Sequence, residues 1–248
     1  HPGTLRGIRQ IAPIYDYFNM KTKYRIIFAS LCGRAIAPLY SQETVNVKLS
    51  ALSPDGRISD VRYDTRGESQ KLTIFRKQRS EPFEYSGPPT FTLYRETGEL
   101  DAEGNPIKKV IAQAKIPQAT GQYLLLLSKT SDSPEKYRAF PIKDDWSSFQ
   151  AGSYRFLNLA PFQIAIKIND KIYQVKESGF TDIDPALEDK EHHKTMMVSI
   201  PGDGDPVRIF EGFLYHQEHK RMLYIMTPRG DVNSGKIRMI AISDVVPQ

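Results

Sequence analysis

The stretch that decides the fold class is Gln163-Ile164-Ala165-Ile166-Lys167-Ile168-Asn169-Asp170-Lys171-Ile172-Tyr173-Gln174-Val175. Isoleucine occupies every second position from 164 to 168, and Asn169-Asp170 follows directly. A period of two places alternate side chains on opposite faces of a strand, while Asn and Asp tolerate the left-handed backbone that tight hairpin turns need. The stretch therefore predicts an antiparallel β-hairpin with one buried face.

The same alternation recurs along the body of the chain, for example in residues 45–50 and 237–241. Turn-forming residues separate the apolar runs, at Pro54-Asp55-Gly56, Gly87-Pro88-Pro89, Glu103-Gly104-Asn105-Pro106, Gly202-Asp203-Gly204-Asp205-Pro206 and Asn233-Ser234-Gly235. Short strands with such turns are typical of a β-sandwich or barrel. Helix is expected only as one turn in residues 145–150 and two turns in residues 186–194.

Five apolar segments recur in the same order, which indicates an internal repeat. The pairs are residues 72–75 with 154–157, 91–95 with 171–175, 110–117 with 196–201, 123–127 with 222–226 and 137–142 with 236–241. We therefore expect an all-β chain of two tandem antiparallel β-sandwich-like modules produced by duplication. The modules would span residues 70–148 and 149–247, with residues 43–69 adding an N-terminal strand or tether. Because β-rich segments resemble one another, a single sandwich sharing strands across Gly152 is the alternative.

Residues 1–42 are basic, whereas the rest of the chain is neutral. Six of the 34 basic residues precede residue 43, but only one of the 29 acidic residues does. A neutral body lacks the basic stripe on which non-specific nucleic-acid binding depends, so we expect no nucleic-acid partner.

The order of features after Met20 is that of a secretory signal peptide. A basic segment, residues 20–25, precedes the apolar residues 26–32 and the small residues Ala35-Ile36-Ala37. We expect residues 1–19 to be a disordered upstream extension and residues 20–42 to be a signal peptide. The protein would then be exported, to the periplasm or outside the cell.

Arg34 follows the apolar run closely and shortens it, so a buried N-terminal strand or a short membrane-associated helix is the alternative for this segment. The run is far below the roughly 20 apolar residues that a spanning helix requires, so we expect no membrane span in the mature form. Cys32 is the only cysteine. Removal of residues 20–42 would leave the protein without cysteine, and therefore without a disulfide, a thiolate nucleophile or a cysteine metal ligand.

Three segments resemble a group of uncharacterised exported bacterial β-sandwich proteins of unknown function. They are Ser80-Glu81-Pro82-Phe83-Glu84-Tyr85-Ser86-Gly87-Pro88, residues 123–127 and residues 149–159, and the similarity would cover about residues 70–248. These are turn and strand sequences rather than catalytic motifs. The resemblance implies export and β structure, and it implies no activity.

Four histidines lie within 28 residues: His192, His193, His216 and His219. Imidazole and carboxylate are the usual zinc ligands in a protein without thiols, and Glu188, Asp189, Glu191 and Glu218 lie nearby in the sequence. The spacing is poor, however, because His216 and His219 flank a predicted hairpin turn and residues 188–194 are typical of a solvated charged loop. We expect exposed loop residues and no bound metal or cofactor, with the four histidines as the candidates if a metal is bound.

Other polar motifs coincide with turns. Asp203-Gly204-Asp205 resembles part of an EF-hand, but Leu214 stands where the terminal glutamate would be, so a polar turn is expected. Asp144-Asp145 beside Trp146 could form half of a glycosidase site, yet neighbouring strand residues face opposite sides. Trp146 is expected to be a core or interdomain anchor. Neither a nucleophile elbow nor a phosphate-binding glycine loop occurs in the sequence.

Two classes of function remain open. The first, which we favour, is an exported, non-catalytic binding or structural module for a protein, envelope or glycan partner. The second is a hydrolase or metal-dependent enzyme of the cell envelope whose site is assembled from separate loops. The first predicts exposed sheet edges and shallow surfaces, whereas the second predicts a pocket that collects several ionisable groups.

Overall fold

Burial alternates with a period of two in the strands at residues 163–168 and 192–200 of this computed structural model, which describes residues 43–130, 133, 135–184, 191–202 and 204–246. In the hairpin of residues 163–175, Ile164, Ile166 and Ile168 are buried and Asn169 takes a positive φ of 50° at the turn. The all-β prediction is confirmed. Within the described residues the only helical element is a turn of 3-10 helix, η1 (Val232–Ser234).

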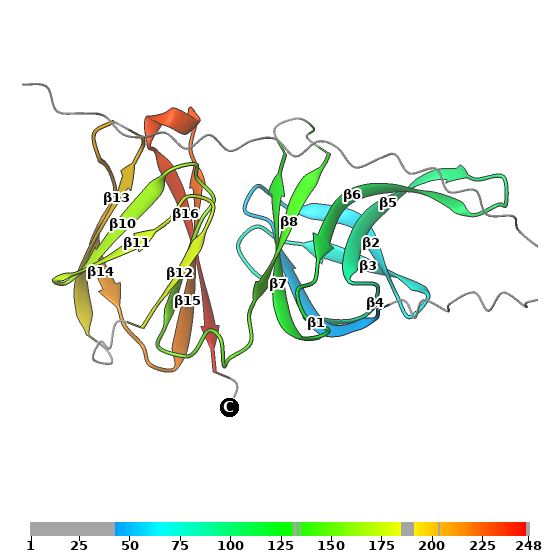
Figure 1. Ribbon diagram of the computed structural model, residues 1–248, viewed down its shortest axis with the longest axis horizontal. Coiled ribbons are helices and arrows are strands. Elements are labelled where there is room, and N and C mark those ends of the chain that lie inside the picture. The colour runs from blue at the N-terminus through cyan, green and yellow to red at the C-terminus, as the bar shows by residue number, and fades with distance from the viewer. Residues whose placement is uncertain (1–42, 131–132, 134, 185–190, 203, 247–248) are drawn as a thin grey trace, which may run out of the picture. The chain divides into compact units, whose positions relative to one another are not determined.

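The strands form four sheets of four (Figure 1). The first eight are β1 (Val45–Leu52), β2 (Ile58–Thr65), β3 (Glu68–Ile74), β4 (Phe83–Gly87), β5 (Thr90–Leu100), β6 (Pro106–Lys115), β7 (Thr120–Lys129) and β8 (Tyr137–Lys143). They build the sheets β4-β1-β7-β8 and β3-β2-β5-β6. We call this pair of sheets the first sandwich.

The remaining eight strands repeat the arrangement. They are β9 (Tyr154–Asn158), β10 (Gln163–Ile168), β11 (Lys171–Val175), β12 (Phe180–Ile183), β13 (His192–Ile200), β14 (Val207–Tyr215), β15 (Lys220–Pro228) and β16 (Ile237–Val245). Their sheets are β12-β9-β15-β16 and β11-β10-β13-β14, the second sandwich. Adding eight to each strand number of the first sandwich gives the strand orders of the second. The two tandem sandwich-like modules therefore share one topology.

The repeat differs in detail from the expected one. Residues 123–127 and 222–226 lie in β7 and β15, and residues 137–142 and 236–241 lie in β8 and β16, so these two pairs are equivalent. The other three pairs match strands that are not equivalent: β3 with β9, β5 with β11 and β6 with β13. Each sandwich also contains one parallel pair, β1 with β7 and β9 with β15, in sheets that were expected to be antiparallel.

The first sandwich begins before residue 70, because β1, β2 and β3 all pair within its sheets. The boundary expected at residue 70 falls inside β3. Residues 145–149 form a hydrogen-bonded turn rather than a helix. Of the segment expected to be helical near residue 190, residues 192–194 begin β13 and residues 185–190 lie outside the described residues. The expected extension, signal peptide and Cys32 lie outside them as well.

Each sandwich encloses its own apolar core, and a third apolar cluster joins the sandwiches. The joining cluster consists of Leu52, Leu124, Leu126, Ile142, Phe149, Leu157, Leu223, Ile225, Ile240 and Ile242. Apart from Phe149, which lies between β8 and β9, its members come from the β4-β1-β7-β8 and β12-β9-β15-β16 sheets, which we call the facing sheets. The other face of each of these sheets packs into its own sandwich core. The described residues therefore belong to one compact unit.

We predict that Leu223→Ala destabilises the protein by about 2–5 kcal/mol, because Leu223 is 1% exposed in the joining cluster and truncation leaves a cavity there. Urea unfolding followed by circular dichroism measures the change. Ile172→Ala is the control, since this side chain is 67% exposed on β11, and it should shift stability by less than about 0.5 kcal/mol. Equal effects of the two variants would contradict the assignment of a packed junction.

Candidate functional site

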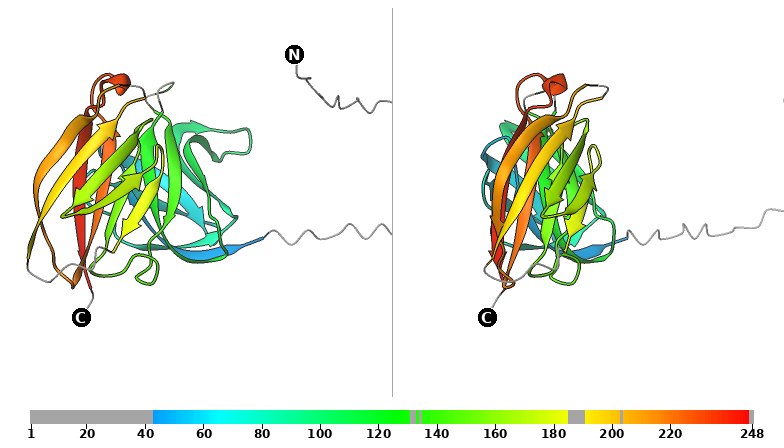
Figure 2. Two further views of the ribbon diagram at one scale, coloured as in Figure 1. Left: turned by 60° about the vertical axis from the view of Figure 1, so that its left-hand side comes forward. Right: turned by 90° about the vertical axis from the view of Figure 1, so that its left-hand side faces the viewer.

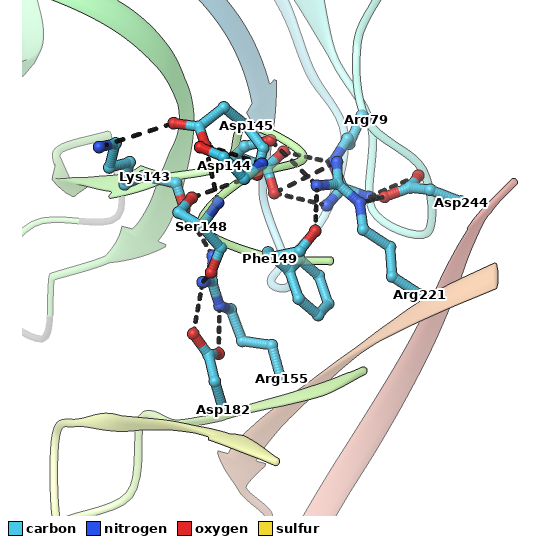
Figure 3. A network of polar contacts seen from close by, with 11 residues as sticks. Arg79, Lys143, Asp144, Asp145, Ser148, Phe149, Arg155, Asp182, Arg221 and Asp244 are labelled. Carbon is cyan, nitrogen blue, oxygen red and sulfur yellow. Dashed lines mark hydrogen bonds and ion pairs between the residues drawn. The ribbon is translucent and has the colours of Figure 1, made fainter. Parts of the chain in front are cut away.

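A cluster of four charged side chains lies at the junction of the two sandwiches (Figure 3). Arg79 donates from Nε and Nη2 to the two carboxylate oxygens of Asp144, both at 3.1 Å, and from Nη1 to Asp244 at 2.8 Å. Arg221 on β15 donates to Asp244 on β16 at 3.1 Å and to the main-chain oxygens of Asp144 and Phe149. We call these four residues the junction cluster: Arg79, Asp144, Arg221 and Asp244.

Burial makes this pairing obligatory. The side chains of Asp144 and Arg221 are only 2% and 3% exposed. An ionised group at such depth is stable only when its charge and its hydrogen-bonding capacity are matched. The guanidinium of Arg221 also lies 3.9 Å from the ring centre of Trp146 and 4.9 Å from that of Phe149. Trp146 therefore packs on an arginine of the second sandwich, in the position expected of an interdomain anchor.

Asp144 and Asp145 have different hydrogen-bond partners. Asp144 faces the two arginines, whereas Asp145 accepts hydrogen bonds from the main-chain N–H groups of Ser147 and Ser148. Burial acts to raise the pKa of Asp145, but hydrogen bonds from Ser147 and Ser148 outweigh it and lower the pKa below its ordinary value. The two carboxylates thus hold the connection between the sandwiches, and they do not face each other across a cleft as a glycosidase pair would.

A second buried arginine fixes the other end of this connection. Arg155 on β9 donates to both carboxylate oxygens of Asp182 on β12, each at 2.6 Å. It also donates to the main-chain oxygens of Lys143 and Ser148, at 2.5 and 3.3 Å (Figure 3). The segment from β8 to β9 is therefore held by charge-assisted hydrogen bonds along its length.

The four candidate histidines separate into buried and exposed pairs. His193 and His216 are 5% and 4% exposed, so the interpretation of exposed loop residues is wrong for both. Their rings lie 6.3 Å apart, centre to centre. His216 Nδ1 lies 2.9 Å from Tyr154 Oη, and the Asn169 side-chain amide lies 3.2 Å from His193 Nδ1.

The other two histidines are exposed and lie elsewhere. His192 is on the opposite face of β13 from His193, against the rings of Tyr215 and Phe213. His219 lies in the turn between β14 and β15. In the part of the chain that the structure describes, no three His, Cys, Asp or Glu side chains are grouped so that they could hold a metal. Glu188, Asp189 and Asp203 lie outside that part.

The core beside His216 contains a stack of aromatic rings. Phe156 and Tyr224 are stacked with ring centres 4.7 Å apart, and Tyr154 lies 6.3 Å from Tyr224. Burial raises the pKa of Tyr154 well above its ordinary value and raises the pKa of Tyr224 to about 12. Both phenols are therefore neutral at physiological pH, and both serve the core as large, partly polar packing groups.

An edge strand with exposed aromatic side chains lies in the outer sheet of the second sandwich. Strand β14 pairs with β13 and ends the β11-β10-β13-β14 sheet (Figure 2). Phe213 is 65% exposed and Tyr215 48% exposed, and the His192 ring lies 5.0 Å from the Tyr215 ring. We call Phe213, Tyr215 and His192 the β14 aromatic patch. Sequence reasoning considered His192 only as a metal candidate and missed the patch, although Phe213 and Tyr215 alternate in the sequence.

The other edge strands are blocked or shorter. Strand β8 contains Pro141, and β6 lies against β8, while β4, β11 and β12 have only four or five residues. Strand β3 is rich in polar residues. Strand β16 equals β14 in length, but Ile240 and Ile242 pack in the joining cluster and Asp244 belongs to the junction cluster. Proline, charge, bulges and shortness are the usual protections of a sheet edge. The first part of β14 has a bulge and the Arg208–Glu211 ion pair, whereas residues 212–215 pair regularly with β13 and carry none of these protections.

Comparisons with known proteins identify no family. No family model matches the chain, and no curated protein matches it. One solved structure that is similar to it is the tip fimbrial protein Mfa3 from Porphyromonas gingivalis with C-terminal truncation. The identity is 8% and the TM-score 0.22, over 82% of this chain and 99% of the other. At this TM-score the likeness carries no argument. Among the described residues, no helix has the length and apolar character needed to cross a membrane.

We predict that Arg221→Ala destabilises the protein by about 3–5 kcal/mol, because it leaves the buried Asp144 carboxylate short of a charge partner. The exposed pair Lys108–Asp64 supplies the control, and Lys108→Ala should cost less than about 1 kcal/mol. Urea unfolding followed by Trp146 fluorescence measures both changes. A loss below 1 kcal/mol in Arg221→Ala would show that the junction does not depend on this arginine.

We predict that Tyr224 releases its proton only near pH 12. The pKa is raised in the folded state, so the stability contributed by neutral Tyr224 is present below about pH 10 and falls as the pH rises toward 12. Ultraviolet difference titration of the protein against Tyr224→Phe measures the phenolate directly. Appearance of the missing phenolate signal near pH 10 in the folded protein would contradict the burial argument.

Proposed function

We propose that the protein is an exported, non-catalytic binding or structural β-sandwich protein that engages a partner protein through strand β14. The observation that carries this proposal is the last part of the β14 edge, residues 212–215, which pairs with β13 on one side, has no described strand on the other side and carries the β14 aromatic patch. An unprotected edge presents main-chain N–H and C=O groups that an extended segment of another chain can pair with. Exposed aromatic side chains at alternate positions would then select the partner.

The charged groups at the junction support a binding or structural role over catalysis. Asp144, Arg79, Arg221 and Asp244 satisfy one another, and Arg155 is matched by Asp182. Catalytic acids, bases and nucleophiles have to remain available to a substrate, whereas these groups are used to hold the two sandwiches together. Export is supported by the order of basic, apolar and small residues from Met20 to Ala37, which lie outside the described residues.

Site-specific cross-linking in the producing cell tests the proposal. A photoreactive phenylalanine analogue is placed at Phe213, with the matched control at Ile172, an equally exposed position on the same sheet. We expect one discrete protein adduct from position 213 and none from position 172. The adduct should be lost when Tyr215→Lys is added, because this substitution removes one ring of the β14 aromatic patch and places a charge there. Equal labelling from both positions would contradict a specific partner at β14.

The enzyme alternative is tested on the same purified protein. Thermal stability is followed with zinc and with calcium, and a panel of hydrolase substrates is then screened. A metal-dependent rise in melting temperature that disappears in the His216→Ala, His219→Ala double variant, together with turnover, would overthrow the non-catalytic proposal. We expect neither the rise nor the turnover.

A further inference from the structure

An apolar pocket of about 660 Å³ lies at the junction, away from the junction cluster and from β14. Its walls come from β7 and β8 of the first sandwich and from β9, β12 and their flanking loops in the second. The apolar lining includes Leu126, Phe140, Ile142, Leu157, Leu159 and Phe180. We call this cavity the junction pocket. Its volume and lining are those of sites that hold a small molecule, and boundaries between modules are a preferred place for such sites.

The pocket exists because the packing of the facing sheets ends there. Ile142 and Leu157 are buried in the joining cluster. Further out, Phe140 on β8 is 42% exposed and Phe180 on β12 is 53% exposed. Strands β8 and β12 are the end strands of the facing sheets, so no further strand of either sheet covers these rings. Two large aromatic side chains thus remain at the rim of a cavity that has an apolar floor.

The polar part of the wall is cationic. Arg138 lines the pocket from the face of β8 that also presents Phe140 and Ile142, and no Asp or Glu lines it. Among the described residues, Arg138 belongs to no ion pair. Lys129 also borders the pocket, but on β7 it shares the face of Leu125 and Leu127, which pack in the core of the first sandwich, so its side chain is directed away from the cavity. The Arg138 guanidinium is therefore the cation available to a ligand.

We propose that the junction pocket binds an amphipathic organic anion, with its apolar body on the Phe140 and Phe180 side and its acidic group near Arg138. Apolar burial supplies most of the affinity, since each buried methylene contributes about 0.8 kcal/mol. The Arg138 guanidinium supplies selectivity, because a carboxylate or phosphate forms charge-assisted hydrogen bonds with it and a cationic head group is repelled. This site is separate from the β14 edge, so it does not depend on the partner-binding function proposed above.

Isothermal titration calorimetry of the whole purified protein with dodecanoate, below its micelle concentration, tests the proposal. We expect one site per chain. Dodecyltrimethylammonium, which has the same chain and the opposite charge, should bind at least about tenfold more weakly, in line with the loss of a charged hydrogen bond. Acetate, which has the acidic group without the chain, should not bind measurably. Equal binding of the anionic and cationic amphiphiles, or no binding of dodecanoate, would overturn the proposal.

Two sets of variants locate the site. Arg138→Ala should abolish the preference for the anion, whereas Lys167→Ala, on the outer sheet, should leave it unchanged. Phe140→Ala with Phe180→Ala should weaken both amphiphiles, and because these rings are partly exposed the fold is expected to persist. Unchanged dodecanoate affinity in both pocket variants would overturn the proposal. So would a dimer in analytical ultracentrifugation that dissociates in the Phe140→Ala, Phe180→Ala variant, because a second copy would then be the occupant.

Discussion

Burial of the Arg221 side chain is unfavourable unless neighbouring groups match its charge and its hydrogen-bond donors. Its guanidinium lies against the rings of Trp146 and Phe149, and it donates to Asp244 and to two main-chain oxygens. Asp144 is equally buried and is satisfied by Arg79. Removing one member leaves another uncompensated, so the set behaves as one unit rather than as separate contacts. The two sandwiches are consequently held in one arrangement that apolar packing alone would specify less tightly.

This arrangement also explains where the open surfaces are. The joining cluster occupies the middle of the facing sheets, and the junction cluster lies at the ends of β8, β15 and β16. The junction pocket begins where the apolar packing ends at β8 and β12. The outer sheet of the second sandwich contributes its inner face to the core and leaves β14 at an edge that no described strand pairs with. Binding surfaces therefore lie at the margins of the facing sheets and at the edge of an outer sheet, while the junction cluster is structural.

Local patterns in the sequence predicted the strands well. Period-two alternation and turn residues predicted the all-β class and the hairpin at Asn169, because both depend on neighbouring residues only. The repeat was found where the strands are most distinctive, in the leucine-rich β7 and its equivalent β15. It was misaligned among β3, β5 and β6, because amphipathic strands share one alternating pattern and that pattern does not identify which strand is which.

The sites were harder to predict, because their residues are brought together only by the fold. Arg79 and Asp244 are 165 positions apart and still form an ion pair, and no local pattern connects them. The sequence did contain an indication that His193 is buried. His193, Thr195 and Met197 occupy alternate positions of β13, and all three are buried. The charged residues before His193 hid this alternation and favoured the interpretation of an exposed loop.

The parallel pairing of the first and seventh strands sets the order in which each sandwich can form. Asn46 lies opposite Thr120, and Tyr154 lies opposite Met222, so the centre of each facing sheet closes only after most of its module is available. Such a contact requires the closure of a long loop, which is entropically unfavourable and slows folding. As the chain emerges in sequence order, β1 has to wait for β7, and β9 for β15. A chain interrupted before residue 120 would carry β1 with one edge unpaired, a form prone to wrong association, whereas a complete first module can close before the second has been made.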